Sequence, residues 1–293
     1  MQNRKIEKEV KKAVIPIAGL GTRFFPLGKV LPKEFWPLVD LPMLQYIVEE
    51  AAASGIKEII FVNRPEERKA LDYFKEKVKS KKILESRHKE SFIKNIKKLE
   101  TLSRQIKFSQ VFQINPKGDG DAILKAEREI GGENFAVLFT DDIIISRVPC
   151  LLQLKKVFKK NLKPVIALSK VPQKSFPSYG MIQKENIGRK IYKIKKIIEK
   201  PKINESPSSL AIVGRYILTP KILDYLKEAE YNQRGEKILG EVLAQKIKEE
   251  EVLGCEFEGK WLECGNKMSY LKSNFYLSLK HPKFGKELKK FWK

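Results

Sequence analysis

Short apolar runs alternate with amphipathic stretches from residue 14 to residue 171. The runs are rich in Val, Ile and Phe, and they predict strands at residues 14–17, 58–62, 107–113, 135–140 and 164–171. The stretches between them have helical spacing and predict helices at residues 41–54, 66–79, 119–130 and 148–160. Such alternation favours parallel strands joined by right-handed crossovers. We therefore expect a doubly wound, mostly parallel α/β sheet of the Rossmann-like type.

Two features interrupt this regular pattern. Residues 80–104 are rich in lysine and are expected to leave the fold as an excursion that is helical or partly loop. Pro16 cannot donate a hydrogen bond to a neighbouring strand, so the first strand is expected to end near it.

The pattern changes after residue 178. Three predicted strands, at residues 179–185, 190–201 and 208–218, follow one another without intervening helices, which indicates an antiparallel β region. Beyond it, the spacing predicts helices at 221–229, 236–250 and 266–280, a strand at 251–257, and a basic amphipathic helix at 282–293.

Composition narrows the class of protein. The 293 residues are 42% hydrophobic, enough to bury a full core, and no apolar run reaches the ~20 residues that a membrane helix needs. The N-terminus is charged, unlike a signal peptide. Three cysteines form no disulfide framework and fit a reducing compartment, so the expected location is the cytoplasm. With only His88 and His281 present, a Ser-His-Asp triad or a histidine-bearing zinc site is not expected.

The formal net charge of +23 raises the question of nucleic-acid binding. The excess lies in three stretches, 75–107, 184–202 and 280–293, and consists mostly of lysines between aliphatic residues. Arginines interleaved with aromatic residues are absent. Solvated basic faces on an enzyme with anionic substrates are therefore favoured over a nucleic-acid surface, which stays open as the alternative.

Residues 18–23, Ala-Gly-Leu-Gly-Thr-Arg, follow the first strand and predict a phosphate-binding turn. Glycines let the backbone approach a ligand closely, and Arg23, Lys29 and Lys33 supply cations for a polyphosphate. The spacing excludes a P-loop, because Gly21 is followed by Thr-Arg, and a dinucleotide fingerprint, because position 24 is Phe. A simple strand-to-helix turn is the competing interpretation.

Polar residues also follow two other predicted strands, at 113–120 and at Asp141-Asp142. The carboxyl ends of parallel strands meet at one edge of a sheet, so these segments should converge on one ligand. Paired carboxylates beside phosphates suit Mg²⁺, although either aspartate could instead cap a turn.

Residues 18–42, AGLGTRFFPLGKVLPKEFWPLVDLP, resemble the G-x-G-T-R-x-x-P, P-K-E and V-D-x-P signature of the sugar nucleotidyltransferases, specifically the bacterial UTP–glucose-1-phosphate uridylyltransferases. Further segments match in family order: residues 113–122 (Q-x-x-x-K-G-x-G-x-A), Tyr179-Gly180, residues 198–201 (I-E-K-P), residues 211–216, and residues 261–267 around Cys-Gly-Asn-Lys. The resemblance covers residues 13 to about 275.

The resemblance implies roles for particular residues. The expected roles are catalytic for Arg23, Lys33 and Lys200; nucleotide-binding for Ala18, Gly19, Leu20, Gly21, Thr22, Glu34, Gln113 and Gly118; sugar-binding for Gly180, Glu199 and Val213; and metal-binding for Asp141 and Glu263. It divides one nucleotidyltransferase domain, 1–293, into a nucleotide-binding half (1–175), a sugar-binding β region (176–265) and C-terminal helices (266–293).

The implied reaction joins UTP and glucose 1-phosphate into UDP-glucose and pyrophosphate with Mg²⁺, in a homo-oligomer of two or more copies. Three departures from the family pattern stand out: Glu263 replaces an aspartate, Asp121 replaces a histidine, and the G-D/E-x-x-L-T-D segment survives only in part at 235–241. Two alternatives follow: the same chemistry with another nucleotide, such as dTTP, or another sugar, and a non-catalytic homologue that binds anions or nucleic acid.

Overall fold

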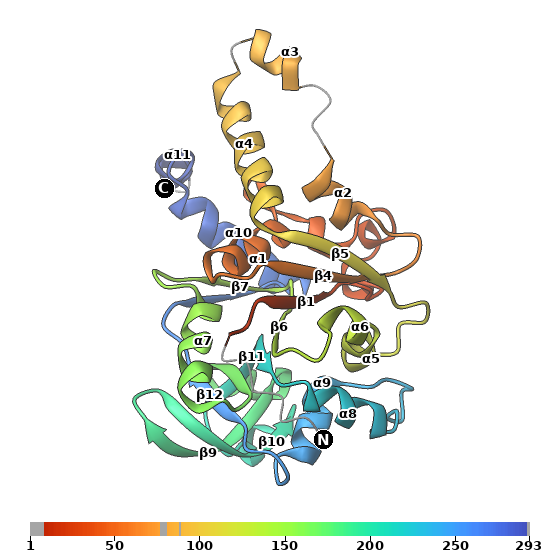
Figure 1. Ribbon diagram of the computed structural model, residues 1–293. Helices are drawn as coiled ribbons and strands as arrows, with labels where there is room; N and C mark the ends of the chain where they lie inside the picture. The colour runs from red at the N-terminus through yellow and green to blue at the C-terminus, as the bar shows by residue number, and fades with distance from the viewer. Residues whose placement is uncertain (1–8, 77–80, 88, 292–293) are drawn as a thin grey trace.

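A computed structural model describes residues 9–76, 81–87 and 89–291 (Figure 1). Within this part, nine strands form one twisted sheet. Their order across the sheet is β5 (Lys107–Phe112), β4 (Glu58–Asn63), β1 (Lys12–Pro16), β6 (Phe135–Leu138), β11 (Leu210–Leu218), β8 (Val165–Lys170), β12 (Leu253–Glu256), β10 (Ile191–Glu199) and β9 (Gly180–Gly188).

The sheet has a parallel part and a mixed part. Strands β5, β4, β1 and β6 run parallel, and β1 ends at Pro16 as expected. Strand β11 runs antiparallel to both β6 and β8, and β9 and β10 form an antiparallel pair. The predicted antiparallel region is therefore a continuation of the same sheet, beginning where β11 inserts beside β6.

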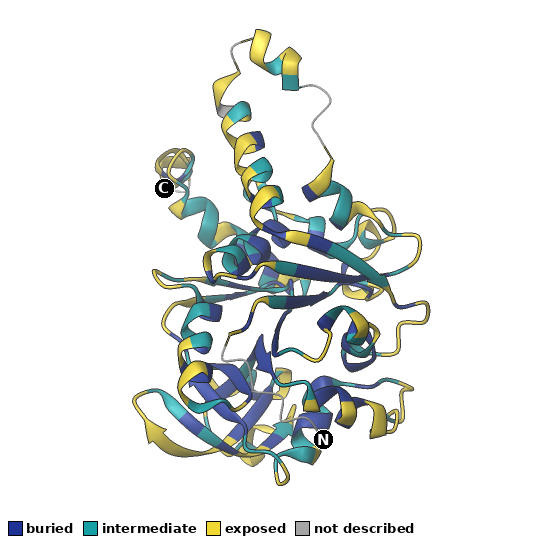
Figure 2. Ribbon diagram, in the orientation of Figure 1, coloured by how far each residue is buried: buried dark blue, intermediate teal, exposed yellow. Residues whose placement is uncertain are grey.

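Helices cover both faces of the sheet, as a doubly wound fold requires. Ala13 and Ile15 of β1 face a core shared with α1 (Met43–Ala53) and α7 (Cys150–Asn161). Val14, between them, faces the opposite core. That core is built with α5 (Asp119–Lys125), α6 (Glu127–Ile130), α8 (Lys221–Glu228) and α9 (Leu239–Lys246). Figure 2 shows the central strands buried between these layers, and the predicted fold class is confirmed.

The lysine-rich segment leaves the body of the molecule, as predicted. Helices α3 (Lys81–Ser86) and α4 (Glu90–Gln105) project from the sheet edge beyond β5, beside α2 (Lys69–Lys75) (Figure 1). The helix predicted at 66–79 is shorter than expected, because α2 ends at Lys75. Residues 77–80 and His88 lie outside the described residues.

The remaining strands form two short pairs outside the main sheet. Strand β7 (Asp142–Ile145) pairs with β13 (Lys260–Glu263), and β2 (Pro37–Leu38) pairs with β3 (Leu41–Pro42). Short 3₁₀ turns span Thr22–Phe24, Leu27–Lys29, Lys33–Phe35, Gln173–Ser178 and Ile203–Glu205. Since residues 41 and 42 belong to β3, the helix predicted at 41–54 begins only at Met43.

Helices α10 (Lys267–Lys280) and α11 (Gly285–Phe291) follow at the C-terminal side. The helix predicted at 282–293 starts three residues late, and its last two residues lie outside the described part. The helix predicted at 236–250 is reduced to α9. Among the described residues, no helix combines the length and apolar character needed to cross a bilayer.

Candidate active site

A cavity of about 290 Å³ lies where the glycine loop, the end of β6 and the antiparallel strands meet. Segments from eight parts of the chain contribute residues to it. The lining residues are Arg23, Asp119, Phe139, Asp141, Asp142, Ser178, Tyr179, Gly180, Glu199, Lys200, Ile212, Gly214, Tyr216, Ile238, Gly240, Trp261, Glu263 and Gly265. Six of the predicted site residues, Arg23, Asp141, Gly180, Glu199, Lys200 and Glu263, thus face one space.

The loop after β1 presents backbone donors. Gly21 adopts a left-handed conformation (φ 61°), in which glycine is favoured, and it precedes the turn that carries Thr22 and Arg23. Within the described residues, the N–H groups of Gly19, Leu20 and Gly21 donate to no protein acceptor. Unpaired N–H groups in an exposed glycine turn suit a phosphate.

Lys33 connects this loop to the end of β6. Its Nζ atom lies 2.6 Å from Oδ2 of Asp141. Burial acts to raise the pKa of Asp141, but the charge and hydrogen bond of Lys33 outweigh it, so the pKa is lowered. For Lys33, burial acts to lower the pKa, and the opposing charge of Asp141 leaves it raised. Both groups are therefore held in their charged forms at the cavity.

Asp142 has a different environment from Asp141. Its Oδ1 accepts a hydrogen bond from Trp261 Nε1 at 2.6 Å, and its Oδ2 accepts one from the backbone N–H of Gly214 at 2.9 Å. Burial, together with the charge of Asp141, raises the pKa of Asp142 to about 7. Asp142 thus ties β7 to β13 and β11, while Asp141 is the member of the pair that meets cations.

Arg215 stabilises the backbone around Asp141 and Asp142. This side chain is fully buried in β11 and pairs with Glu50 of α1, with Nη2 2.9 Å from Oε2. It also donates to the carbonyl oxygens of Phe139, Gly214 and Asp142 at 3.0, 2.8 and 2.6 Å. Because the carbonyls of Phe139 and Asp142 flank Asp141, the guanidinium fixes the backbone that carries the predicted metal ligand.

Gly265 separates the two predicted metal ligands. A Cβ at this position would lie 3.3 Å from Glu263 Oε1, 3.4 Å from Asp141 Oδ2 and 3.8 Å from Arg23 Nη1. The two carboxylate oxygens therefore border one small space, into which a Cβ at position 265 would project. Oxygen donors of this kind, completed by phosphates and waters, fit Mg²⁺. Glu263 also accepts hydrogen bonds from the hydroxyl of Tyr179 at 3.0 Å and from Asn266 at 3.3 Å, which orient it.

Glu199 and Lys200 lie at the end of β10, on the antiparallel side of the cavity. Their charged groups are 3.3 Å apart. Lys200 has φ 46°, an unfavourable backbone conformation for a lysine, and strain of this kind is common at functional positions. Its N–H donates to the carbonyl of Tyr179 at 3.1 Å, which holds the turn in place.

Ten of the sixteen predicted site residues do not line the cavity: Ala18, Gly19, Leu20, Gly21, Thr22 and Lys33 from the glycine loop and the segment after it, and Glu34, Gln113, Gly118 and Val213. Val213 packs into the core, whereas its neighbours Ile212 and Gly214 face the cavity. Glu34 is buried beside Arg64 and Glu67, and burial raises its pKa to about 7. Gln113 lies at the end of β5, and Gly118 lies at the start of α5. The side chain of Gln113 donates a hydrogen bond to the carbonyl of Gly118 at 3.0 Å.

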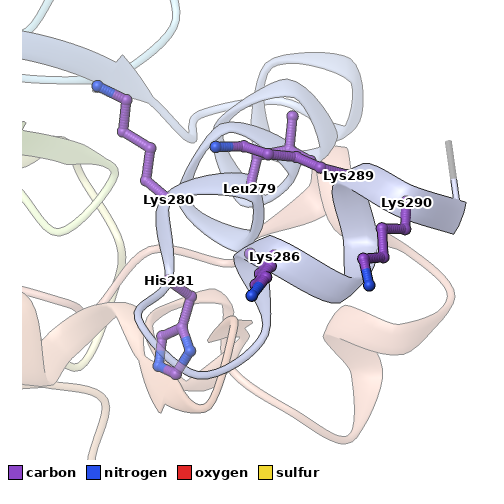
Figure 3. Close-up of a pocket in the computed structure, with 7 residues that line it drawn as sticks. Leu279, Lys280, His281, Lys286, Lys289 and Lys290 are labelled. Carbon is purple, nitrogen blue, oxygen red and sulfur yellow. The ribbon is translucent and has the colours of Figure 1, made fainter. Parts of the chain in front are cut away.

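A hollow of about 580 Å³ at the turn between α10 and α11 contains none of the predicted residues (Figure 3). Its side chains include Lys280, His281, Lys286, Lys289 and Lys290. This hollow has cations but no carboxylate, so it lacks the paired charges found in the cavity at the strand ends.

The sequence profile of the nucleotidyl transferase family matches residues 12–278. The chain belongs to this family. Among curated relatives, it is 39% identical over 287 residues to the UTP–glucose-1-phosphate uridylyltransferase of Staphylococcus haemolyticus, and 37% identical over 286 residues to that of Staphylococcus epidermidis. Each alignment covers 98% of both chains.

Solved structures of nucleotidyl transferases agree with this placement. A UDP-glucose pyrophosphorylase complexed with UDP-glucose has a TM-score of 0.85 and 34% identity, over 93% of this chain and 100% of its own. A UTP-bound UGPase from Acinetobacter baumannii has a TM-score of 0.87 and 31% identity, over 97% and 98% of the two chains. The predicted resemblance is confirmed.

Several lining residues of this nucleotidyl transferase were not predicted. Asp119 was given no role of its own within residues 113–120, yet it lines the cavity, and its Oδ1 accepts a hydrogen bond from the N–H of Leu239 at 2.8 Å. Burial raises its pKa to about 6. Tyr216 and Trp261 belong to segments that the family resemblance singled out. An aromatic residue within such a segment was the feature of the sequence that could have predicted them as lining residues.

Proposed function

We propose that this chain is a UTP–glucose-1-phosphate uridylyltransferase, which makes UDP-glucose and pyrophosphate from UTP and glucose 1-phosphate. The observation that carries the proposal is the meeting of Arg23, Asp141 and Lys200 in one cavity. Cations on both sides of a carboxylate suit two anionic substrates that must be brought together with a metal ion. The names of relatives that align over almost their full length support the same reaction.

The chemistry needs orientation and charge rather than a protein nucleophile. An oxygen of the sugar phosphate, already ionised near neutral pH, attacks the α-phosphorus in line while pyrophosphate leaves. Arg23, Lys33 and the N–H groups of the glycine loop hold the triphosphate, and Lys200 holds the attacking phosphate. These fixed donors stabilise the negative charge that develops on the leaving pyrophosphate.

The cofactor in this proposal is Mg²⁺, with Asp141 and Glu263 as its protein ligands. When bound, Mg²⁺ supplies positive charge that offsets the charge of the phosphates. Glutamate at 263 is longer than the aspartate of the family pattern, and the hydrogen bond from Tyr179 keeps its carboxylate beside Gly265.

The remaining proposals concern organisation. We assign residues 1–175 to nucleotide binding, 176–265 to the sugar and 266–293 to the C-terminal helices. Gly180 and Glu199 lie at the sugar end, where a Cβ on Gly180 would come within 2.9 Å of Glu199 Oε2. The side chain of Val213 points away from the cavity, so we propose that its backbone, between two lining residues, contacts the sugar. We further propose a cytoplasmic homo-oligomer.

The test is an assay of the purified protein with UTP, glucose 1-phosphate and Mg²⁺, in which UDP-glucose is identified by chromatography. Release of pyrophosphate across a panel of UTP, dTTP, CTP, ATP and several sugar 1-phosphates should be fastest with UTP and glucose 1-phosphate. Faster turnover of another pair would change the assigned substrates. No turnover with any pair, together with salt-sensitive binding to random DNA or RNA, would favour the non-catalytic alternative.

A further inference from the structure

The side-chain amide of Gln113 is held between two oxygen atoms. Its Nε2 lies 2.7 Å from Oδ2 of Asp121 and 3.0 Å from the carbonyl oxygen of Gly118. Gln113 is 2% exposed and Asp121 is 3% exposed, so water cannot readily replace these contacts. The amide of Gln113 therefore has a defined orientation before any nucleotide arrives.

The chemistry of the two partners fixes that orientation. A peptide carbonyl only accepts hydrogen bonds, and so does a carboxylate, so the NH₂ group of Gln113 must face them. Both of its protons are then used. Oε1 points the other way, and no described residue donates a hydrogen bond to it. The amide of Gln113 could in principle both donate and accept hydrogen bonds, but here only its acceptor, Oε1, is left for a ligand.

The position of Asp121 is itself well supported. It lies in the first turn of α5, where a negative charge is favoured by the helix dipole. The hydroxyl of Tyr231 is 3.4 Å from its Oδ1, and Lys125 is 3.7 Å away. On the other side, Gly118 has φ 94°, and a Cβ there would collide with the backbone of Lys237. The backbone of residue 237 is joined to this turn by hydrogen bonds of 2.8 Å with Gly120 and Lys117.

We propose that Asp121 is a positioning residue for base recognition: it keeps Oε1 of Gln113 turned toward the nucleobase and so selects UTP over CTP. The inference rests on the proposed function and on the nucleotide-binding role that the family resemblance implies for Gln113 and Gly118, and it takes the base as the part of the nucleotide that they contact. Uracil carries a donor, N3–H, on its Watson–Crick edge, and this donor matches Oε1. Cytosine has a lone pair at N3, which would oppose Oε1 and leave both acceptors without a proton.

The backbone of Gly118 complements this arrangement. Within the described residues its N–H group has no protein acceptor. A free donor beside a fixed acceptor is the complement of the neighbouring O4 and N3–H of uracil. In cytosine, both positions are reversed, because N4 carries protons and N3 does not.

The test compares the wild-type chain with Asp121→Asn. An asparagine can turn either its donor or its acceptor toward Gln113, so the amide of Gln113 is no longer held in one orientation. We expect the ratio of UTP affinity to CTP affinity, measured by equilibrium titration of each nucleotide with Mg²⁺, to fall about tenfold. A ratio is insensitive to the fraction of folded protein, so partial loss of stability does not obscure the result.

Lys125→Met is the matched control, since it removes the ion pair of Asp121 but leaves the carboxylate beside Gln113. Its ratio of UTP affinity to CTP affinity should equal that of the wild type. Asp121→Glu, which keeps an obligate acceptor, should retain most of the discrimination. If Asp121→Asn discriminates as well as the wild type, the role of Asp121 is refuted while the proposed function stands. If the wild type binds no nucleotide, the proposed function fails, and this inference fails with it.

Discussion

The Nζ atom of Lys33 lies 2.6 Å from Oδ2 of Asp141, although 108 residues separate them along the chain. This ion pair joins the segment after the glycine loop to the end of β6. It places the cation proposed to hold the triphosphate and the proposed metal ligand in one charged unit. The charge on Asp141 is thus compensated locally, and Lys33 is oriented toward the cavity edge.

Replacing Lys33 with methionine tests this unit. The variant keeps a side chain of similar length but removes a charged contact worth about 2–4 kcal/mol in the transition state. We expect kcat/KM for UTP to fall by roughly 30- to 1,000-fold. Steady-state kinetics in the UDP-glucose assay measure the change. Lys69→Met, which removes an exposed pair with Glu67, is the control and should be near wild type. Equal activity of the two variants would contradict the role of Lys33.

Lys200 can be tested against a neighbour of the same type. Lys200→Ala removes the cation at the strained turn after β10, and kcat/KM for glucose 1-phosphate should fall by roughly 30- to 1,000-fold, since roughly 2–4 kcal/mol is lost. Lys202→Ala, two residues away, removes a lysine that is 87% exposed and should have little effect. Circular dichroism should show intact folding for both. Comparable kinetics for the two variants would show that Lys200 is a solvated surface charge without a role in the reaction.

Much of the fold could be predicted because β1, β4 and β6 are buried on both faces and therefore read as continuous apolar runs. The site could be predicted in part for a related reason. Polar residues that directly follow such runs, including Arg23 and Asp141, must emerge at the same edge of a parallel sheet. Both inferences use only local pattern and the geometry of parallel strands.

The rest depends on contacts between distant residues, which leave no local pattern. Asp142 accepts a hydrogen bond from Trp261, 119 residues later, and this contact helps pair the short strands β7 and β13. Arg215 interrupts an apolar strand, and its burial is explained by its pairing with Glu50, 165 residues away, together with its hydrogen bonds to three backbone carbonyls. No separate role was assigned to Asp119 because the helix start that it stabilises, at Leu239, is 120 residues away.

Gly265→Ala tests the proposed metal site directly. The methyl group would press on Glu263 Oε1 and Asp141 Oδ2 at 3.3 and 3.4 Å, so the space between the carboxylates would be filled. We expect the Mg²⁺ concentration for half-maximal activity to rise about tenfold, as seen when ligand positions are disturbed. Gly188→Ala, where the nearest atom is 3.8 Å away, is the control. An unchanged Mg²⁺ dependence in Gly265→Ala would place the metal elsewhere.

The pair formed by Arg215 and Glu50 should dominate stability at the site. Glu50→Gln leaves a fully buried guanidinium without its counter-charge, and breaking such a pair costs about 3–5 kcal/mol. Chemical denaturation should show this loss as a lower midpoint. Lys107→Met removes a pair with Glu58 whose lysine is 73% exposed, so it should cost no more than about 1 kcal/mol. A similar small change in both variants would show that the buried pair is not structural.

Glu34 should make stability depend on pH. Burial raises its pKa from the ordinary value of 4.5 to about 7, so the folded chain keeps a proton that the unfolded chain has lost. Its contribution to stability is therefore fully present below pH 4.5 and is lost as the pH rises to about 7. A shift of this size corresponds to about 3 kcal/mol.

Glu34→Gln, which is neutral at every pH, removes this dependence. Relative to wild type, the variant should gain about 3 kcal/mol in unfolding free energy between pH 4.5 and pH 8. Urea denaturation at pH 4.5, 6 and 8 measures the difference, and Glu66→Gln, at an exposed position, controls for the loss of one charge. Parallel pH curves for wild type and Glu34→Gln would mean that the carboxyl group ionises in the folded chain as easily as in the unfolded one.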